Sequence, residues 1–130
     1  MTDRQPVIPQ GYTASPAFSP GVRVGNLLFV SGQVSVDNRG NPVGVGDCAA
    51  QTRQVFARIR SVVEAAGATL ADVAKITTFL TDVNHYAAFN KVRSETFTAS
   101  PPASSTVIVA ALVRPEFLVE IEAVVNLPGR

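Results

Sequence analysis

The sequence predicts an α+β fold in which a β-sheet carries two main helices on one face. Two segments repeat apolar residues at helical spacing, one between Asp47 and Gly67 and one over residues 84–98. Shorter β-prone segments lie before, between and after them. Two helices cover one face of such a sheet, so we expect another subunit to cover the other face. No repeat or linker divides residues 1–130, which predicts a single domain.

The first twenty residues of the chain are rich in proline. Residues 1–20 hold four of the nine prolines, and we expect an extended arm there because proline fixes φ and removes a backbone donor. Two strands are expected at 22–24 and 27–30, joined by a tight turn at Gly25-Asn26, a pair that tolerates positive φ. A third short strand is expected at 33–36, before a turn-rich cluster.

The helical segments have recognisable ends. Asp47 can cap the first helix and Gly67 can stop it. The apolar residues of this helix are Val55, Ile59, Val62, Val63 and Ala66. A short helical turn over 69–72, with a capping-box pattern, leads into a strand over 73–81. The second helix, over 84–98, ends before two consecutive prolines, which resist the α region.

Two strands are expected near the end of the chain. Residues 106–112 are apolar on both faces, which predicts a central strand. Residues 118–125 alternate, so that one face is wholly apolar and Glu120 and Glu122 share the other, roughly 7 Å apart. Two carboxylates on one face can divide general-acid and general-base work if their environments differ. A pair of solvated strand residues is the alternative.

Composition excludes several classes of function. Eleven Lys and Arg against ten Asp and Glu give a formal net charge of +1, with no cationic run, so we predict neither a nucleic-acid nor a membrane partner. Cys48 and His85 are the only residues of their kinds, which excludes an intrachain disulfide and a zinc site of several Cys or His in one chain. The N-terminal residues lack the apolar core of a signal peptide, so we expect a soluble cytoplasmic protein.

Two further positions are candidates for a binding site. Ser31-Gly32-Gln33 follows an apolar strand, where the glycine permits close approach to a ligand and Ser31 can donate a hydrogen bond. A plain bulge or turn is the alternative. Asn90 lies within the second helix, where asparagine is a mediocre helix former and needs a partner if buried. A surface asparagine is the alternative there.

Several short motifs are more informative as an ordered set than singly. They are Gly25-Asn26, Ser31-Gly32-Gln33, residues 63–67, residues 72–78, Phe89-Asn90, residues 102–105 and residues 119–123. Over roughly residues 16–125 this set resembles the Rid family (reactive intermediate deaminase, also called YjgF/YER057c/UK114). The resemblance implies a chorismate-mutase-like fold with a mixed sheet, and a homotrimer with an inner β-barrel and clefts between subunits. It also implies hydrolysis of enamines and imines to keto acids and ammonia, without metal or cofactor.

The resemblance assigns roles to individual residues. Ser31 and Asn90 match positions that line the cleft, and Glu120 matches the acid that orients or activates the attacking water. A carboxylate in a closed cleft can accept a water proton and return it to the departing amine. Phe18 stands where the family has an aromatic hydroxyl, and Thr106 where a cysteine is typical.

Ser104 is the main departure from the family pattern, because the deaminases carry an arginine there that grips the substrate carboxylate. A serine hydroxyl supplies neither the positive charge nor the two parallel N–H donors of a guanidinium. This weakens the prediction of the usual 2-imino-acid activity. Arg114, in the turn before the last strand, and Arg93, one helical turn from Asn90, are candidates to replace it. The alternative for both residues is that they are ordinary surface arginines. A further possibility is that the natural ligand has no carboxylate.

We therefore predict a trimeric, cofactor-free hydrolase of an enamine, imine or related reactive small metabolite, with Glu120 positioning water. The predicted substrate-binding residues are Ser31, Asn90, Phe18, Ser104, Thr106 and Arg114. The alternative is a non-catalytic trimer that binds a small molecule or a protein on the same scaffold. Older names of the family describe ribonucleases and translation inhibitors. The near-zero net charge argues against the RNA binding that these functions require.

Overall fold

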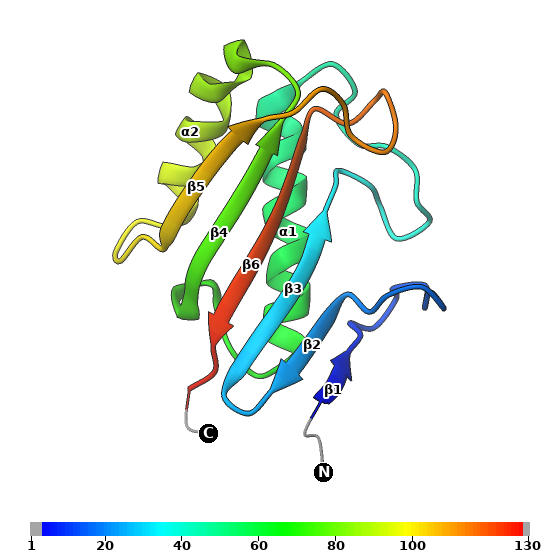
Figure 1. The fold of residues 1–130 in the computed structure, drawn as a ribbon, viewed down its shortest axis with the longest axis vertical. Coiled ribbons are helices and arrows are strands. Elements are labelled where there is room, and N and C mark those ends of the chain that lie inside the picture. Colours follow the sequence, from blue (N-terminus) through cyan, green and yellow to red (C-terminus); the bar gives the residue numbers. More distant parts are fainter. Residues whose placement is uncertain (1–3, 129–130) are drawn as a thin grey trace.

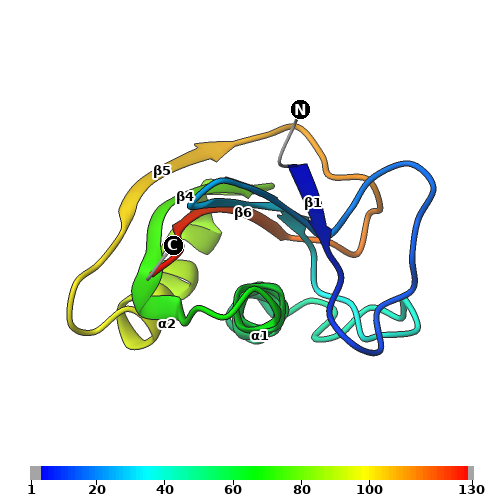
Figure 2. The same cartoon turned by 90° about the horizontal axis from the view of Figure 1, so that it is seen from below.

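One six-stranded mixed sheet organises the chain, and both long helices lie against the same face of it (Figure 1). The view along the sheet shows α1 and α2 together on one side (Figure 2). This computed structural model describes residues 4–128. The strand order is β1-β2-β3-β6-β4-β5, and every neighbouring pair is antiparallel except β4 and β5, which are parallel. The predicted α+β class, with two helices on one face, is confirmed.

The strands are β1 (Arg4–Val7), β2 (Gly21–Val24), β3 (Leu27–Gln33), β4 (Val73–Leu80), β5 (Ala103–Ile108) and β6 (Val119–Asn126). The helices are α1 (Cys48–Ala65) and α2 (Tyr86–Thr96), and two short 3₁₀ turns are η1 (Leu70–Asp72) and η2 (Val83–His85). Neither long helix has a stretch apolar and long enough to cross a bilayer.

The core lies between α1 and the sheet. In β6 the alternation predicted from sequence is confirmed, since Val119, Ile121, Ala123 and Val125 are buried. The helix contributes the buried side chains Val55, Ile59, Val62 and Val63, at the spacing that places them on one face. Each such buried aliphatic side chain stabilises the fold by roughly 1.5–3 kcal/mol relative to exposure.

Local signals at element ends are also confirmed. The Asp47 carboxylate accepts a hydrogen bond from the backbone N–H of Ala50 at 3.0 Å, which caps α1. Gly67 has φ +85° directly after this helix, and Gly25 has φ +59° in the β2–β3 turn, so both glycines adopt the left-handed region. Thr69 and Asp72 form the predicted capping box.

The N-terminal region differs from the prediction in two places. Within the expected arm, Arg4–Val7 forms β1 and pairs with β2. Pro6 is tolerated there because β1 is an edge strand, whose outer donors face no partner. The separate strand expected at 33–36 is not formed. Instead β3 continues to Gln33 through an irregularity between Val30 and Gln33, and the chain then leaves the sheet.

The strand expected in the centre of the sheet is at its edge. β5 begins at Ala103, earlier than expected, and pairs only with β4. Val107 and Ile108 are 45% and 48% exposed in the isolated chain. The prediction that residues 106–112 form a central strand is therefore wrong. A segment that is apolar on both faces can be buried within a sheet or can present an exposed apolar surface, and the sequence pattern does not distinguish the two.

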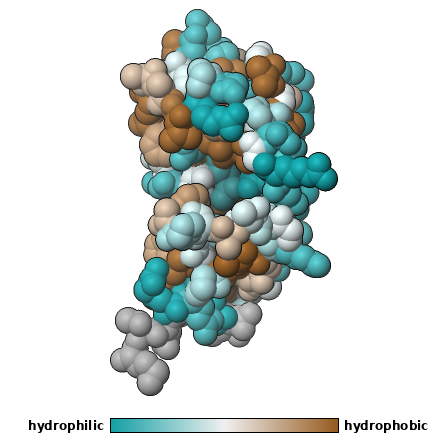
Figure 3. Space-filling model, turned by 90° about the vertical axis from the view of Figure 1, so that its right-hand side faces the viewer, coloured by the Kyte–Doolittle hydropathy of each residue, from teal (hydrophilic) through white to brown (hydrophobic). Residues whose placement is uncertain are grey.

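The sheet face opposite the helices carries both polar and apolar side chains. Leu27 and Phe29 are exposed there, and Phe29 is 45% accessible. Figure 3 shows the adjoining side of the molecule, on the right in Figure 1, where brown and teal residues are also interspersed. No helix covers this face among residues 4–128.

Candidate functional site

Apart from Phe18 and Arg114, the predicted site residues lie in two groups on opposite faces of the sheet. Glu120 alternates with the buried residues of β6 and therefore points away from the helices. Ser104 and Thr106 are level with Ile76 and Thr78 of β4, which are buried on the helix face. We call the first set, Ser31, Gly32 and Glu120, the Glu120 group, whereas Phe18 lines a pocket with Gly32 and Arg58 that does not include Glu120. The second set, Tyr86, Asn90, Arg93, Ser104 and Thr106, lines the Arg93 pocket.

Gly32 and Glu120 form the centre of the Glu120 group. They lie on the neighbouring strands β3 and β6, and a Cβ added to Gly32 would overlap the Glu120 carboxylate. The glycine therefore leaves the space that the carboxylate occupies. Burial raises the pKa of Glu120 above its usual value, and the negative charge of Glu122 raises it further. Glu122 itself is exposed, so the two carboxylates have different environments.

Ser31 fixes the preceding loop against β3. Its hydroxyl donates to the carbonyl oxygen of Ser19 at 2.6 Å, and its backbone N–H donates to that of Pro20 at 2.9 Å. The same loop carries Phe18, which is 62% exposed and lines a pocket of about 180 Å³ together with Gly32. The hydroxyl hydrogen of Ser31 is thus used within the chain, while its oxygen remains able to accept.

The Arg93 pocket lies between α2 and β5 and has a volume of about 680 Å³. Tyr86, Asn90 and Arg93 are spaced by four and three residues, which places them on one face of α2. The Arg93 guanidinium donates to the Ser104 hydroxyl at 2.9 Å through Nη1. Its Nη2 donates to the Tyr86 hydroxyl at 2.9 Å and to Asn90 Oδ1 at 2.6 Å. The structure thus brings together Asn90, Ser104 and the candidate Arg93. Tyr86 was missed, although its helical spacing to Asn90 was a usable signal.

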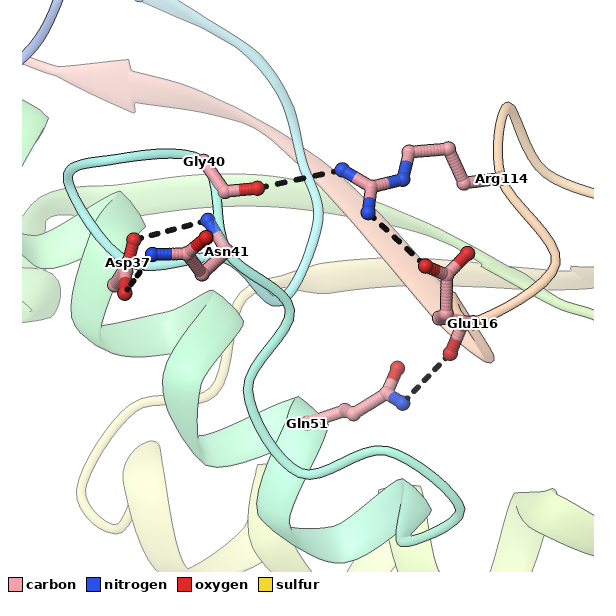
Figure 4. A network of polar contacts seen from close by, with 6 residues as sticks. All are labelled: Asp37, Gly40, Asn41, Gln51, Arg114 and Glu116. Carbon is pink, nitrogen blue, oxygen red and sulfur yellow. Dashed lines mark hydrogen bonds and ion pairs between the residues drawn. The ribbon is translucent and has the colours of Figure 1, made fainter.

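Arg114 makes its contacts elsewhere. Its guanidinium forms an ion pair with Glu116 at 3.0 Å and donates to the carbonyl oxygen of Gly40 at 3.3 Å (Figure 4). The backbone carbonyl of Glu116 also accepts from the Gln51 side chain at 2.9 Å. Arg114 therefore ties two loops together and contacts no member of either group.

The remaining titratable candidates are not arranged as a catalytic cluster. Cys48 is buried, and burial raises the pKa of its thiol. Its sulfur lies 3.8 Å from the backbone carbonyl oxygen of His85 and 3.9 Å from the hydroxyl oxygen of Thr52. Within residues 4–128, no three His, Cys, Asp or Glu side chains gather in a way that would hold a metal ion.

Comparisons with known proteins agree on the family of this chain. The sequence model of the family described as Endoribonuclease L-PSP matches residues 10–127. A RutC family protein of Sulfurisphaera tokodaii is 44% identical over 107 residues, which are 82% of this chain and 85% of that protein. The crystal structure of the YjgF gene product from E. coli is similar with a TM-score of 0.84 and 32% identity, covering 94% of this chain and 98% of that one. A Rid family protein of unknown function from Yersinia pestis has a TM-score of 0.89 and 31% identity, covering 95% and 99%.

Proposed function

The chain belongs to the Rid/YjgF family, and we propose that it is a cofactor-free hydrolase of an enamine, imine or related reactive small metabolite. The observation that carries this proposal is the half-buried Glu120 carboxylate, seated against Gly32 and with a raised pKa. A carboxylate with a pKa closer to neutral is a better general acid and base near physiological pH.

We propose that the complete site forms between two copies of the chain. The Glu120 group and the Arg93 pocket lie on opposite faces of the sheet, so one chain does not bring them together. A neighbouring copy on the open face supports such a site, because Leu27 and Phe29 are exposed apolar residues there. The proposed assembly is a homotrimer whose sheets form an inner barrel, as the family resemblance implies.

In the proposed reaction, water adds to the carbon of a C=N bond while Glu120 takes the proton that the water loses. Glu120 then returns this proton to the nitrogen. The C–N bond breaks, the C=O bond forms, and the hydroxyl proton leaves with the nitrogen, so that an iminium ion and water give a carbonyl compound and ammonium. No metal or cofactor is needed, because the protonated imine is already electrophilic.

The other predicted residues have supporting positions in this proposal. Ser31 keeps the loop before β3 in place, and Phe18 on this loop would approach the substrate from the same side. Asn90, Ser104 and Thr106 border the substrate from the α2 side of a neighbouring copy. Arg114 is left out, since its ion pair with Glu116 supports a structural role.

Ammonia release tests the proposal directly. Imines are generated freshly from several amino acids and amines and offered to the wild type, Glu120→Gln and Glu122→Gln. We expect wild-type turnover to fall by about 10²- to 10⁴-fold in Glu120→Gln, which removes the proton acceptor. Glu122→Gln, compared at a pH above the acidic limb of the wild-type profile, is the matched control, because it removes an exposed carboxylate from the same face of β6. Unchanged turnover in Glu120→Gln would contradict the mechanism.

The second candidate function is a non-catalytic trimer that binds a small molecule. Ser104 favours it, because the resemblance places a substrate-binding arginine at this position. It predicts no turnover by the wild type and a gain of turnover in Ser104→Arg. Ribonuclease activity, which the family description names, has less support here because the net charge is only +1.

A further inference from the structure

The positive charge of Arg93 has no acidic partner in the part of the chain that the structure describes. Its three hydrogen bonds go to neutral oxygen atoms, those of Ser104, Tyr86 and Asn90. No carboxylate of residues 4–128 lies within ion-pairing distance of it. A partly buried guanidinium without a counter-charge is a favourable place for an anion.

The guanidinium is held in place before any ligand arrives. Besides its three hydrogen bonds, it lies over the ring of Phe89, with 4.9 Å between Arg93 Cζ and the ring centroid, and it lies 5.7 Å from that of Tyr86. Phe89 is fully buried and therefore provides a fixed surface. A cation fixed in this way loses little conformational entropy when a ligand binds.

Donors remain available around Arg93 for a ligand. A guanidinium has five N–H donors, and the contacts within the chain use three. The hydroxyls of Ser104 and Tyr86 accept from Arg93, so their own hydrogens are free to be donated. These groups open into the pocket of about 680 Å³, which has room for a small metabolite.

We propose that Arg93 is a specificity-determining residue that anchors the carboxylate of a singly charged ligand in the Arg93 pocket. The hydroxyls of Ser104 and Tyr86 serve as additional donors. A single guanidinium among neutral hydroxyls balances one negative charge, which favours a monocarboxylate over a doubly charged phosphate. The inference rests on the proposed function, since this pocket is one half of the proposed site, and it assigns a carboxylate to the substrate. The anchoring charge is then supplied by α2, whereas β5 supplies only the Ser104 hydroxyl.

Binding of unreactive probes tests this inference without turnover. Pyruvate and its neutral analogue pyruvamide are titrated by calorimetry into the full-length wild type, Arg93→Gln, Arg93→Lys and Lys91→Gln. We expect the wild type to prefer pyruvate, and Arg93→Gln to weaken pyruvate binding by about 10- to 100-fold while leaving pyruvamide nearly unchanged. Arg93→Lys keeps the positive charge but lacks the planar pair of N–H donors, so its affinity for pyruvate should lie between those of the wild type and Arg93→Gln. Lys91→Gln is the matched control, because it removes an exposed cation from the same helix, outside the pocket lining.

The results separate this inference from the proposed hydrolase. Equal affinity of the wild type for pyruvate and pyruvamide, no pyruvate binding, or equal pyruvate affinity in the wild type and Arg93→Gln would overturn the role of Arg93. Arg93-dependent pyruvate binding without hydrolysis of any imine would retain the anchor and remove the hydrolase. Circular dichroism and melting temperatures establish that each variant is folded.

Discussion

Gly32 and Glu120 are in direct contact between β3 and β6, and the absence of a side chain at Gly32 makes room for the Glu120 carboxylate. The carboxylate lies at the end of a flexible side chain, so a methyl group at Gly32 would displace it rather than break the sheet. This relationship connects a local backbone feature, the irregular end of β3, to the group proposed to handle the proton.

Gly32→Ala should therefore reduce imine hydrolysis while leaving the fold intact. We expect turnover to fall by about 10- to 100-fold, because a displacement of about 1 Å at a reacting group has effects of this size. The melting temperature should change by only a few degrees. The measurement is ammonia release together with thermal unfolding. In a Glu120→Ala background the same substitution should have little further effect; an equal loss in both backgrounds would show that Gly32 acts independently of Glu120.

The pH dependence of turnover should report the interaction between Glu120 and Glu122. Glu120 accepts a proton in the proposed mechanism, so turnover should fall as the pH falls through its raised pKa. Glu122→Gln removes a negative charge that contributes to the raised pKa. The acidic limb of the pH–rate profile should then move to lower pH. An unchanged limb in Glu122→Gln would mean that another group controls it.

The free energy of unfolding should also depend on the protonation of Glu120, but this contribution should fall as the pH rises, whereas turnover should rise. Because the folded-state pKa of Glu120 is raised, the folded chain binds more protons than the unfolded chain between the two pKa values. The contribution of Glu120 to the free energy of unfolding is therefore most favourable below the unfolded pKa and declines as the pH rises through the folded pKa. Glu120→Gln should remove this decline, which urea unfolding at several pH values would measure. A decline of equal size in Glu120→Gln would contradict the assignment.

Features set by neighbouring residues were predictable from the sequence. The Asp47 cap, the Gly25 turn and the alternation in β6 all depend on local backbone geometry or on a period of two or 3.6 residues. The edge position of β5 depends on which strands pair across the sheet, and no local pattern contains that information. β1 was missed for a related reason, since Pro6 is compatible with a strand only at an edge.

The candidate site was predictable only in part. Residue type, periodicity and resemblance predicted Glu120 and Asn90 as candidates, but their separation onto opposite faces required the topology. The contact between Arg93 and Ser104 joins a helix to an edge strand, so it depends on how α2 packs beside β5. Sequence spacing identified Arg93 only as a neighbour of Asn90.

The buried Gln51 should be a large contributor to stability around the loops that lead into β6. Its side-chain amide donates to the carbonyl oxygens of Gly44 and Glu116 at 3.1 and 2.9 Å, and it accepts from the N–H of Leu118 at 2.9 Å. Gln51→Ala leaves these backbone groups without their partner and should lower the free energy of unfolding by about 2–4 kcal/mol. Unfolding in urea measures this loss in the free energy of unfolding. Gln54→Ala is the matched control, because Gln54 makes one hydrogen bond, to Val36, and should cost about 1 kcal/mol; equal losses would contradict this role of Gln51.

The open sheet face should carry the contacts of the proposed assembly. Phe29 lies on that face of β3 and is 45% exposed in the isolated chain, which leaves an apolar ring in contact with water. Burying this ring between copies would contribute about 1–3 kcal/mol for each chain, and placing a charge there would reverse the effect. Phe29→Glu should therefore shift the assembly toward monomers, as measured by analytical ultracentrifugation, and should reduce imine hydrolysis in parallel. Val113→Glu is the matched control, because Val113 is 82% exposed in the loop before β6. A wild type that sediments as a monomer, or Phe29→Glu that keeps the wild-type assembly, would contradict a site formed between copies across this face.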